Sequence, residues 1–118
     1  LYPCDHFVYP EYLLGNIRET DIRTLMRSQK QTDFGLDKRS ALPTKCARCK
    51  YLFACNGECP KHRFNRTENG ETGLNALCMG YFKFFDHVAP YMDTMKSLLQ
   101  EKRAPAEIMP MIKLGLIR

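Results

Sequence analysis

Cysteine is the residue type in this sequence with the clearest chemical meaning. Four of the six cysteines lie in one short run with the spacing C-x2-C-x5-C-x3-C, at Cys46, Cys49, Cys55 and Cys59. A C-x2-C pair places two sulfurs on one turn, where both can face a single ion or cluster, and this geometry is awkward for two disulfides. Interleaved cations lower thiol pKa and favour the ligating thiolate, and they are present at Lys45, Arg48 and Lys50. The run therefore predicts a metal site.

Four thiolates suit tetrahedral Zn²⁺ and an iron–sulfur cubane about equally well. The run ends in Cys59-Pro60, like the C-P ending of bacterial ferredoxin motifs, in which the last cysteine ligates the other cluster of a pair. If Cys59 does so here, Cys78 is the candidate to complete the first site. Cys4 then shares the second site with Cys59.

The pattern Cys46-x2-Cys49-x5-Cys55-x3-Cys59, a gap and Cys78 resembles the SPASM domain of radical S-adenosylmethionine enzymes. The full SPASM pattern has seven cysteines and opens with C-x(9–15)-G-x4-C. Here Leu1-Tyr2-Pro3-Cys4 is similar to the end of that G-x4-C element.

A narrower resemblance, over roughly residues 1–99, is to the anaerobic sulfatase-maturating enzymes. The stretches that carry it are Cys4-Asp5-His6-Phe7-Val8-Tyr9-Pro10-Glu11-Tyr12, Leu14-Gly15-Asn16-Ile17, Cys55-Asn56-Gly57-Glu58-Cys59-Pro60-Lys61 and Gly80-Tyr81-x2-Phe84-Phe85-x-His87-x2-Pro90. Those enzymes use a radical cluster and two auxiliary [4Fe–4S] clusters to oxidise a sulfatase cysteine or serine to Cα-formylglycine. The substrate that the resemblance implies is an unfolded sulfatase peptide.

The resemblance also implies roles for individual residues. One auxiliary cluster would be held by Cys46, Cys49, Cys55 and Cys78. The other would be held by Cys4 and Cys59, with two partners upstream of the sequence. Asp5 matches the family's aspartate proposed to deprotonate the substrate. A general base needs a pKa raised toward neutrality by burial. From the sequence alone, an aspartate in such a turn is more often a helix cap.

The sequence contains no C-x3-C-x2-C run, the motif of the cluster that cleaves S-adenosylmethionine. We therefore expect this chain to be the C-terminal piece of a longer cytoplasmic enzyme. Its N-terminal radical domain would bind S-adenosylmethionine, and the fragment alone would be inactive.

Composition excludes several other classes of protein. The 118 residues contain 44% hydrophobic and 26% charged residues, as in an ordinary globular domain. No apolar run of membrane-spanning length occurs. The formal charge of +5 is offset once thiolates bind a metal, and the basic residues form no compact stripe, so nucleic-acid binding is not favoured. Three disulfides remain the alternative for six cysteines in a secreted chain.

The patterns predict an α+β, cysteine-rich domain over residues 1–79 and a helical segment over residues 80–118 that packs on it. Residues 1–17 read as a β-hairpin remnant. Helices are expected over residues 20–29, starting from a Thr20 cap, and over residues 33–40. Residues 62–76 should form an irregular surface excursion.

The C-terminal part should be helical from Gly80 to about Lys102, with Pro90 in a first helical turn, and again up to about Leu114. The apolar C-terminal end is expected to dock on the rest of the enzyme.

The competing hypothesis is a zinc-stabilised module that binds protein or nucleic acid. There, Cys46, Cys49, Cys55 and either Cys59 or Cys78 would hold one Zn²⁺. Each histidine could also complete a site of three sulfurs and one imidazole, but Cys78 already supplies a fourth sulfur.

Overall fold

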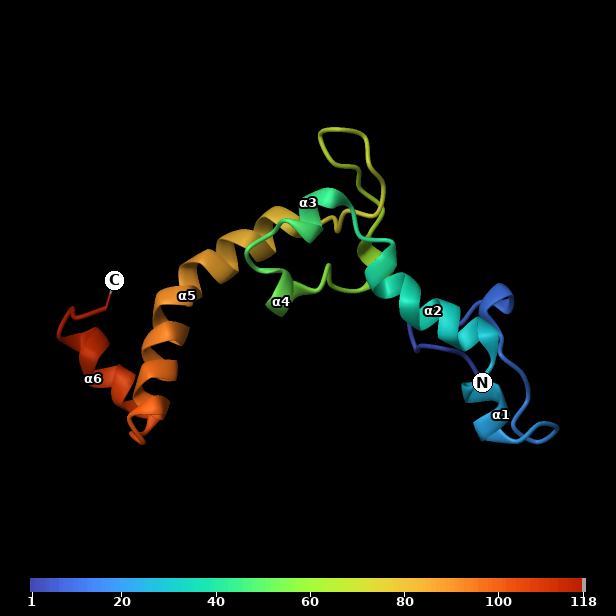
Figure 1. Ribbon diagram of the computed structural model, residues 1–118, viewed down its shortest axis with the longest axis horizontal. Helices are drawn as coiled ribbons and strands as arrows, with labels where there is room; N and C mark the ends of the chain where they lie inside the picture. Colours follow the sequence, from blue (N-terminus) through green and yellow to red (C-terminus); the bar gives the residue numbers. More distant parts are fainter. Residues whose placement is uncertain (118) are drawn as a thin grey trace. The chain divides into compact units, whose positions relative to one another are not determined.

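The computed structural model describes residues 1–117, which form helices joined by long loops (Figure 1). The elements in chain order are η1 (Pro10–Tyr12), α1 (Ile22–Met26), α2 (Gln29–Ser40), α3 (Thr44–Ala47), α4 (Leu52–Cys55), η2 (Pro60–His62), α5 (Cys78–Gln100), η3 (Pro105–Glu107) and α6 (Ile108–Lys113). The chain divides into two compact units, Leu1–Cys78 and the residues from Met79 onward. Each unit is described by itself.

The predicted β-hairpin at the N-terminus is wrong. Within residues 1–117 the strand-like pairing is limited to one isolated antiparallel bridge, between Asn65 and Leu74. Pro10 instead starts the 3-10 helix η1, because proline fixes φ and has no N–H to donate to a strand partner. The fold is therefore helical with irregular loops, and the α+β prediction is corrected to that extent.

The N-terminal segment closes on itself as a loop. The Leu1 amino group donates to the Gly15 carbonyl at 2.6 Å, and the Leu14 N–H donates to the Leu1 carbonyl at 2.9 Å. Phe7 and Phe34 lie edge to face with ring centroids 5.1 Å apart. This aromatic contact packs the loop that carries Cys4 against α2.

Two helices occur near the predicted positions, but their ends differ. Asp21, rather than Thr20, caps α1 and accepts the Arg23 N–H at 2.9 Å. Ser28 caps α2 and accepts the Gln31 N–H at 3.3 Å. Serine at a position with extended backbone begins a helix readily, so α2 starts earlier than the pattern predicted.

Pro90 was predicted to lie in a first helical turn, and this detail is wrong. Pro90 lies inside one continuous helix. Its ring removes one backbone donor, and the Thr94 hydroxyl donates to the Pro90 carbonyl at 2.9 Å. The excursion over residues 62–76 is irregular, as predicted, apart from the isolated bridge.

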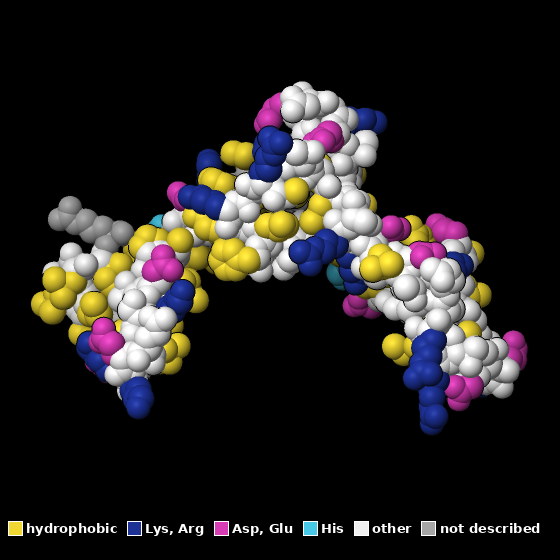
Figure 2. Space-filling model, viewed as in Figure 1, with side chains coloured by type: hydrophobic (Ala, Val, Ile, Leu, Met, Phe, Trp, Pro, Cys, Tyr) yellow, Lys and Arg dark blue, Asp and Glu magenta, His cyan; other side chains and the backbone are white. Residues whose placement is uncertain are grey.

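The buried apolar core of residues 1–117 is small. Its members are Leu25, Cys46, Tyr51, Leu74, Leu98 and Ile108. Large apolar side chains remain exposed on α5 and in and just after α6 (Figure 2), including Phe84, Met92, Met109 and Leu114. In a small domain with so little buried area, a bound metal would add substantially to the folding free energy.

Candidate metal centres

Short helices around the cysteine run bring four thiols into one neighbourhood, which we call site A (Cys46, Cys49, Cys55 and Cys78). Cys46 lies in α3, Cys49 follows that helix, Cys55 ends α4 and Cys78 begins α5. Cys46 and Cys49 occupy one turn, because the Cys49 N–H donates to the Cys46 carbonyl at 3.0 Å. The backbone thus places the first two cysteines on one turn, as the spacing predicted.

The four thiols of site A are near enough to one another to influence each other's ionisation. Burial raises the pKa of the Cys46 thiol, and negative charge on Cys78, Cys55 and Cys49 raises the same pKa further. Burial also raises the pKa of Cys78, Lys45 opposes that shift, and Cys55 and Cys49 add to it. Thiolates so close repel one another, and a bound cation or cationic cluster removes that repulsion.

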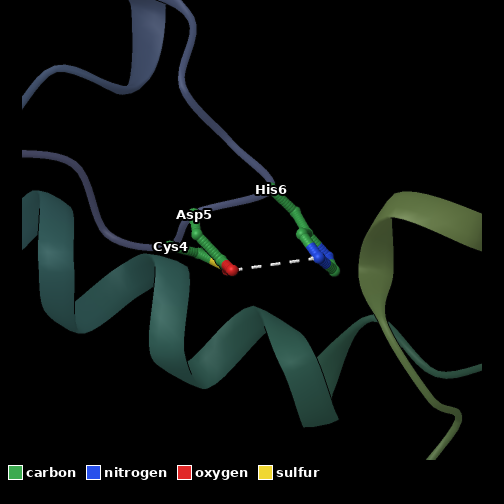
Figure 3. Close-up of side chains that lie close together, drawn as sticks. All are labelled: Cys4, Asp5 and His6. Carbon is green, nitrogen blue, oxygen red and sulfur yellow. Dashed lines mark hydrogen bonds and ion pairs between the residues drawn. The ribbon is translucent and has the colours of Figure 1, made fainter.

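A second group, site B, consists of Cys4, His6 and Cys59. Possible ligand atoms of Cys4, Asp5 and His6 all lie within 4.8 Å of one another (Figure 3). The His6 Nδ1 atom is 3.3 Å from the Cys59 sulfur. Cys59 therefore lies beside the N-terminal loop, although it follows Cys55 by only four residues.

Asp5 sits at the edge of site B with an exposed carboxylate. Its side chain is 89% exposed. The Cys4 thiol donates to Asp5 Oδ1 at 3.2 Å, and this bond, followed by the nearby charge of His6, lowers the pKa of Asp5. In this chain Asp5 is thus an ionised surface carboxylate, rather than the buried one that a raised pKa requires.

A polar network of Glu58, His62 and Asn75 was not found by sequence reasoning. The Glu58 carboxylate accepts hydrogen bonds from His62 Nδ1 at 2.9 Å and from the Asn75 amide at 2.5 Å. Burial raises the pKa of Glu58, but hydrogen bonds from His62, the Cys59 N–H and Asn75 together lower it. Asn75, which belongs to the predicted surface excursion over residues 62–76, is only 3% exposed. The i,i+4 spacing of Glu58 and His62 was the one available signal.

Residues 1–50 match SPASM, described as an iron–sulfur cluster-binding domain. The chain has six free cysteines, and its first 50 residues are similar to this class of iron–sulfur cluster-binding domains. More particularly, it is homologous to a segment of the anaerobic sulfatase-maturating enzymes.

The relatives support this assignment over most of the chain. The serine-type anaerobic sulfatase-maturating enzyme of Bacteroides thetaiotaomicron is 55% identical over the whole chain, which covers 28% of that protein. The cysteine-type enzyme of Clostridium perfringens is 30% identical over 76% of this chain and 24% of its own length. The chain therefore spans about a quarter of these relatives.

Solved structures agree. One described as native anSMEcpe with bound AdoMet and Kp18Cys peptide superposes with a TM-score of 0.65 at 29% identity, over 79% of this chain and 25% of that one. A second, with bound AdoMet and Cp18Cys peptide, gives a TM-score of 0.67 at 28% identity, over 83% of this chain and 27% of that one.

No helix among residues 1–117 combines the length and the apolar character needed to cross a bilayer.

Proposed function

We propose that this chain is the auxiliary-cluster part of a radical S-adenosylmethionine enzyme that oxidises a sulfatase cysteine or serine to Cα-formylglycine. The observation that carries the proposal is the division of the cysteines. Cys55 lies with the thiols of site A, whereas Cys59 lies at site B beside His6. A single four-cysteine zinc site built from the run alone would need both sulfurs at one place.

The donor sets fit iron–sulfur clusters. Site A offers four cysteine thiols, one of them on the buried Cys46, and as thiolates they are the ligand set of a [4Fe–4S] cluster. Cys4 and Cys59 would hold a second cluster together with two thiolates from elsewhere in the full-length enzyme. When bound, such a cluster supplies a one-electron acceptor for the oxidation.

Asp5 would take the proton from the substrate side chain. Its carboxylate is ionised and accessible, so it can accept a proton without first losing one. The hydrogen bond that now lowers its pKa uses the thiol proton of Cys4. A metal-bound cysteine has lost this proton, so metal binding at Cys4 removes that bond and lets the pKa of Asp5 rise toward its ordinary value.

The remaining parts of the proposed reaction lie in other segments of the enzyme. An N-terminal radical domain would bind S-adenosylmethionine and its cluster, and the substrate would be an unfolded sulfatase peptide. Free thiols as ligands require a reducing compartment, which supports a cytoplasmic location. The isolated chain would be inactive.

The test uses the full-length enzyme, purified without oxygen, and compares Cys49→Ala in site A with Cys4→Ala in site B. Each variant should lose about one cluster's worth of iron and sulfide relative to the native enzyme. Unchanged iron in both variants, or a colourless protein with stoichiometric zinc, would refute the proposal. Asp5→Asn should keep its iron but lose formylglycine formation, measured by mass spectrometry on peptides that carry cysteine or serine.

A further inference from the structure

Three consecutive residues between Cys55 and Cys59 have left-handed backbone conformations. Their φ angles are +48° for Asn56, +72° for Gly57 and +54° for Glu58. We call residues 56–58 the left-handed turn. Left-handed conformations are unfavourable for residues with a Cβ atom, so a run of three requires compensation from the surrounding structure.

The left-handed turn separates two ligand cysteines that are neighbours in sequence. The Glu58 N–H donates to the Cys55 carbonyl at 2.7 Å, which closes one tight turn between the two thiols. Cys55 ends α4 at site A, and Cys59 begins the approach to site B. The direction of the chain through this turn therefore decides which centre each sulfur reaches.

The guanidinium of Arg63 holds the carbonyl side of this turn. Arg63 Nε donates to the Gly57 carbonyl at 2.9 Å, and Nη2 donates to the carbonyls of Asn56 at 3.1 Å and Glu58 at 2.7 Å. Successive helix-like residues align their carbonyls, which concentrates partial negative charge at one end. The planar guanidinium is a cation with several N–H donors in fixed directions, so it can bind several such carbonyls at once. A lysine ammonium is a compact point charge and lacks this fixed arrangement of donors.

A fourth bond anchors the same guanidinium to a helix. Arg63 Nη1 donates to the Lys38 carbonyl, near the end of α2, at 2.7 Å. The guanidinium lies close to the turn, since a Cβ atom added to Gly57 would lie 3.2 Å from Arg63 Nη2, nearer than an ordinary van der Waals contact. These four hydrogen bonds of Arg63, which we call the clamp, fix the left-handed turn to α2. The loop that carries Cys4 packs against the same helix through the contact of Phe7 with Phe34.

The side chain of Glu58 connects the left-handed turn to site A. The Glu58 carboxylate accepts from the buried Asn75 amide at 2.5 Å, and the Asn75 carbonyl accepts the Cys78 N–H at 3.1 Å. The turn is therefore held between Arg63 and the segment that presents Cys78.

We infer that Arg63 is a shared positioning residue for both proposed clusters, since it fixes the turn that sends Cys55 to site A and Cys59 to site B. This inference rests on the proposed function, because it concerns ligands of the two auxiliary clusters. Arg63 is assigned a positioning role because its hydrogen bonds go to the carbonyls of the turn and of Lys38. Its loss should impair both centres together, whereas loss of a single ligand impairs one.

The experiment compares Arg63→Gln and Arg63→Lys in the full-length enzyme with the matched control Arg66→Lys. Arg66 lies three residues further on and donates to one carbonyl, that of Gly70, at 3.0 Å. Iron and sulfide per chain, together with the electron paramagnetic resonance signals of the reduced clusters, are measured for each variant. Circular dichroism and thermal unfolding report whether the fold is retained.

Arg63→Gln should lower the iron content toward that of the double variant Cys55→Ala/Cys59→Ala and weaken the signals of both auxiliary clusters. Arg63→Lys should have an intermediate effect, and Arg66→Lys should match the native enzyme. Native iron content in Arg63→Gln, or loss of one cluster only, would overturn the inference. If Arg63→Gln does not fold, Arg63→Lys decides: native signals from both clusters in that variant refute the clamp.

Failure of the proposed function gives a different result. In that case Cys55→Ala and Cys59→Ala would themselves leave iron unchanged. If these two variants each lose iron while Arg63→Gln does not, the proposed function stands and only the role of Arg63 is rejected.

Discussion

Replacement of Gly57 by alanine tests the packing of the left-handed turn. Gly57 is buried and has a φ of +72°. A Cβ atom there would lie 2.2 Å from Leu42 Cδ2 and 3.2 Å from Arg63 Nη2. Leu42 would have to move, and Arg63 is held in place by four hydrogen bonds.

The loss of stability in Gly57→Ala has two contributions, and the same substitution at a second glycine separates them. The left-handed backbone costs alanine about 1–2 kcal/mol, and overpacking adds roughly 1–3 kcal/mol. Gly70 has a similar φ of +81°, but no heavy atom lies within 4 Å of its added Cβ. Gly70→Ala therefore carries the backbone cost alone, and Gly57→Ala should be less stable than Gly70→Ala by roughly 1–3 kcal/mol.

The assay is iron release from the full-length enzyme to a chelator, followed without oxygen by the loss of visible absorption. When opening is fast and reversible, release follows the population of the open form. The difference of roughly 1–3 kcal/mol then corresponds to about 5- to 150-fold faster release for Gly57→Ala than for Gly70→Ala. Equal rates for the two variants would refute the reasoning, because they would show that the space beside Gly57 is not filled as described.

Two further predictions concern polar groups. Asn75→Ala should destabilise unit Leu1–Cys78 by roughly 1.5–3 kcal/mol, because it removes a buried hydrogen bond to the Glu58 carboxylate. Thermal unfolding measures this loss. Asn75→Asp should be less stable than Asn75→Ala, because it brings two carboxylates together. The hydrogen bond from Arg103 lowers the pKa of Glu107 below its ordinary value of 4.5, so the contribution of this pair to stability is complete above that value and is lost as the pH falls through the lowered pKa. A carboxyl NMR titration should show the lowered pKa, and Arg103→Gln should return it to the ordinary range; a Glu107 pKa that stays low in Arg103→Gln would show that Arg103 does not cause the shift.

Several features of the chain could be predicted from sequence because they depend on neighbours along the chain. The C-x2-C spacing puts two sulfurs on one turn, and the structure confirms that Cys46 and Cys49 share one. Helix α5 follows from apolar residues at helical spacing, and the family followed from the cysteine pattern. The position of Pro90 within the helix was predicted wrongly, because a long helix with enough other hydrogen bonds tolerates the loss of one donor.

The N-terminal hairpin was predicted wrongly because alternating aromatic residues indicate a strand only when a partner strand is present. Phe7 and Tyr12 instead pack on each other with ring centroids 5.0 Å apart, and both meet Phe34 of α2. That partner lies far along the chain, so periodicity could not reveal it.

Sequence by itself determined which residues can bind a soft metal, since thiolate chemistry and turn spacing are local properties. The family resemblance already divided the cysteines into two sets, but only the tertiary structure shows which contacts turn the chain between Cys55 and Cys59. Cys59 lies beside His6 because a left-handed turn redirects the chain between Cys55 and Cys59. Arg63 holds this turn by donating hydrogen bonds to the carbonyls of residues 56–58 and of Lys38. The direction of such a turn depends on contacts between distant segments, and these exist only in the folded chain.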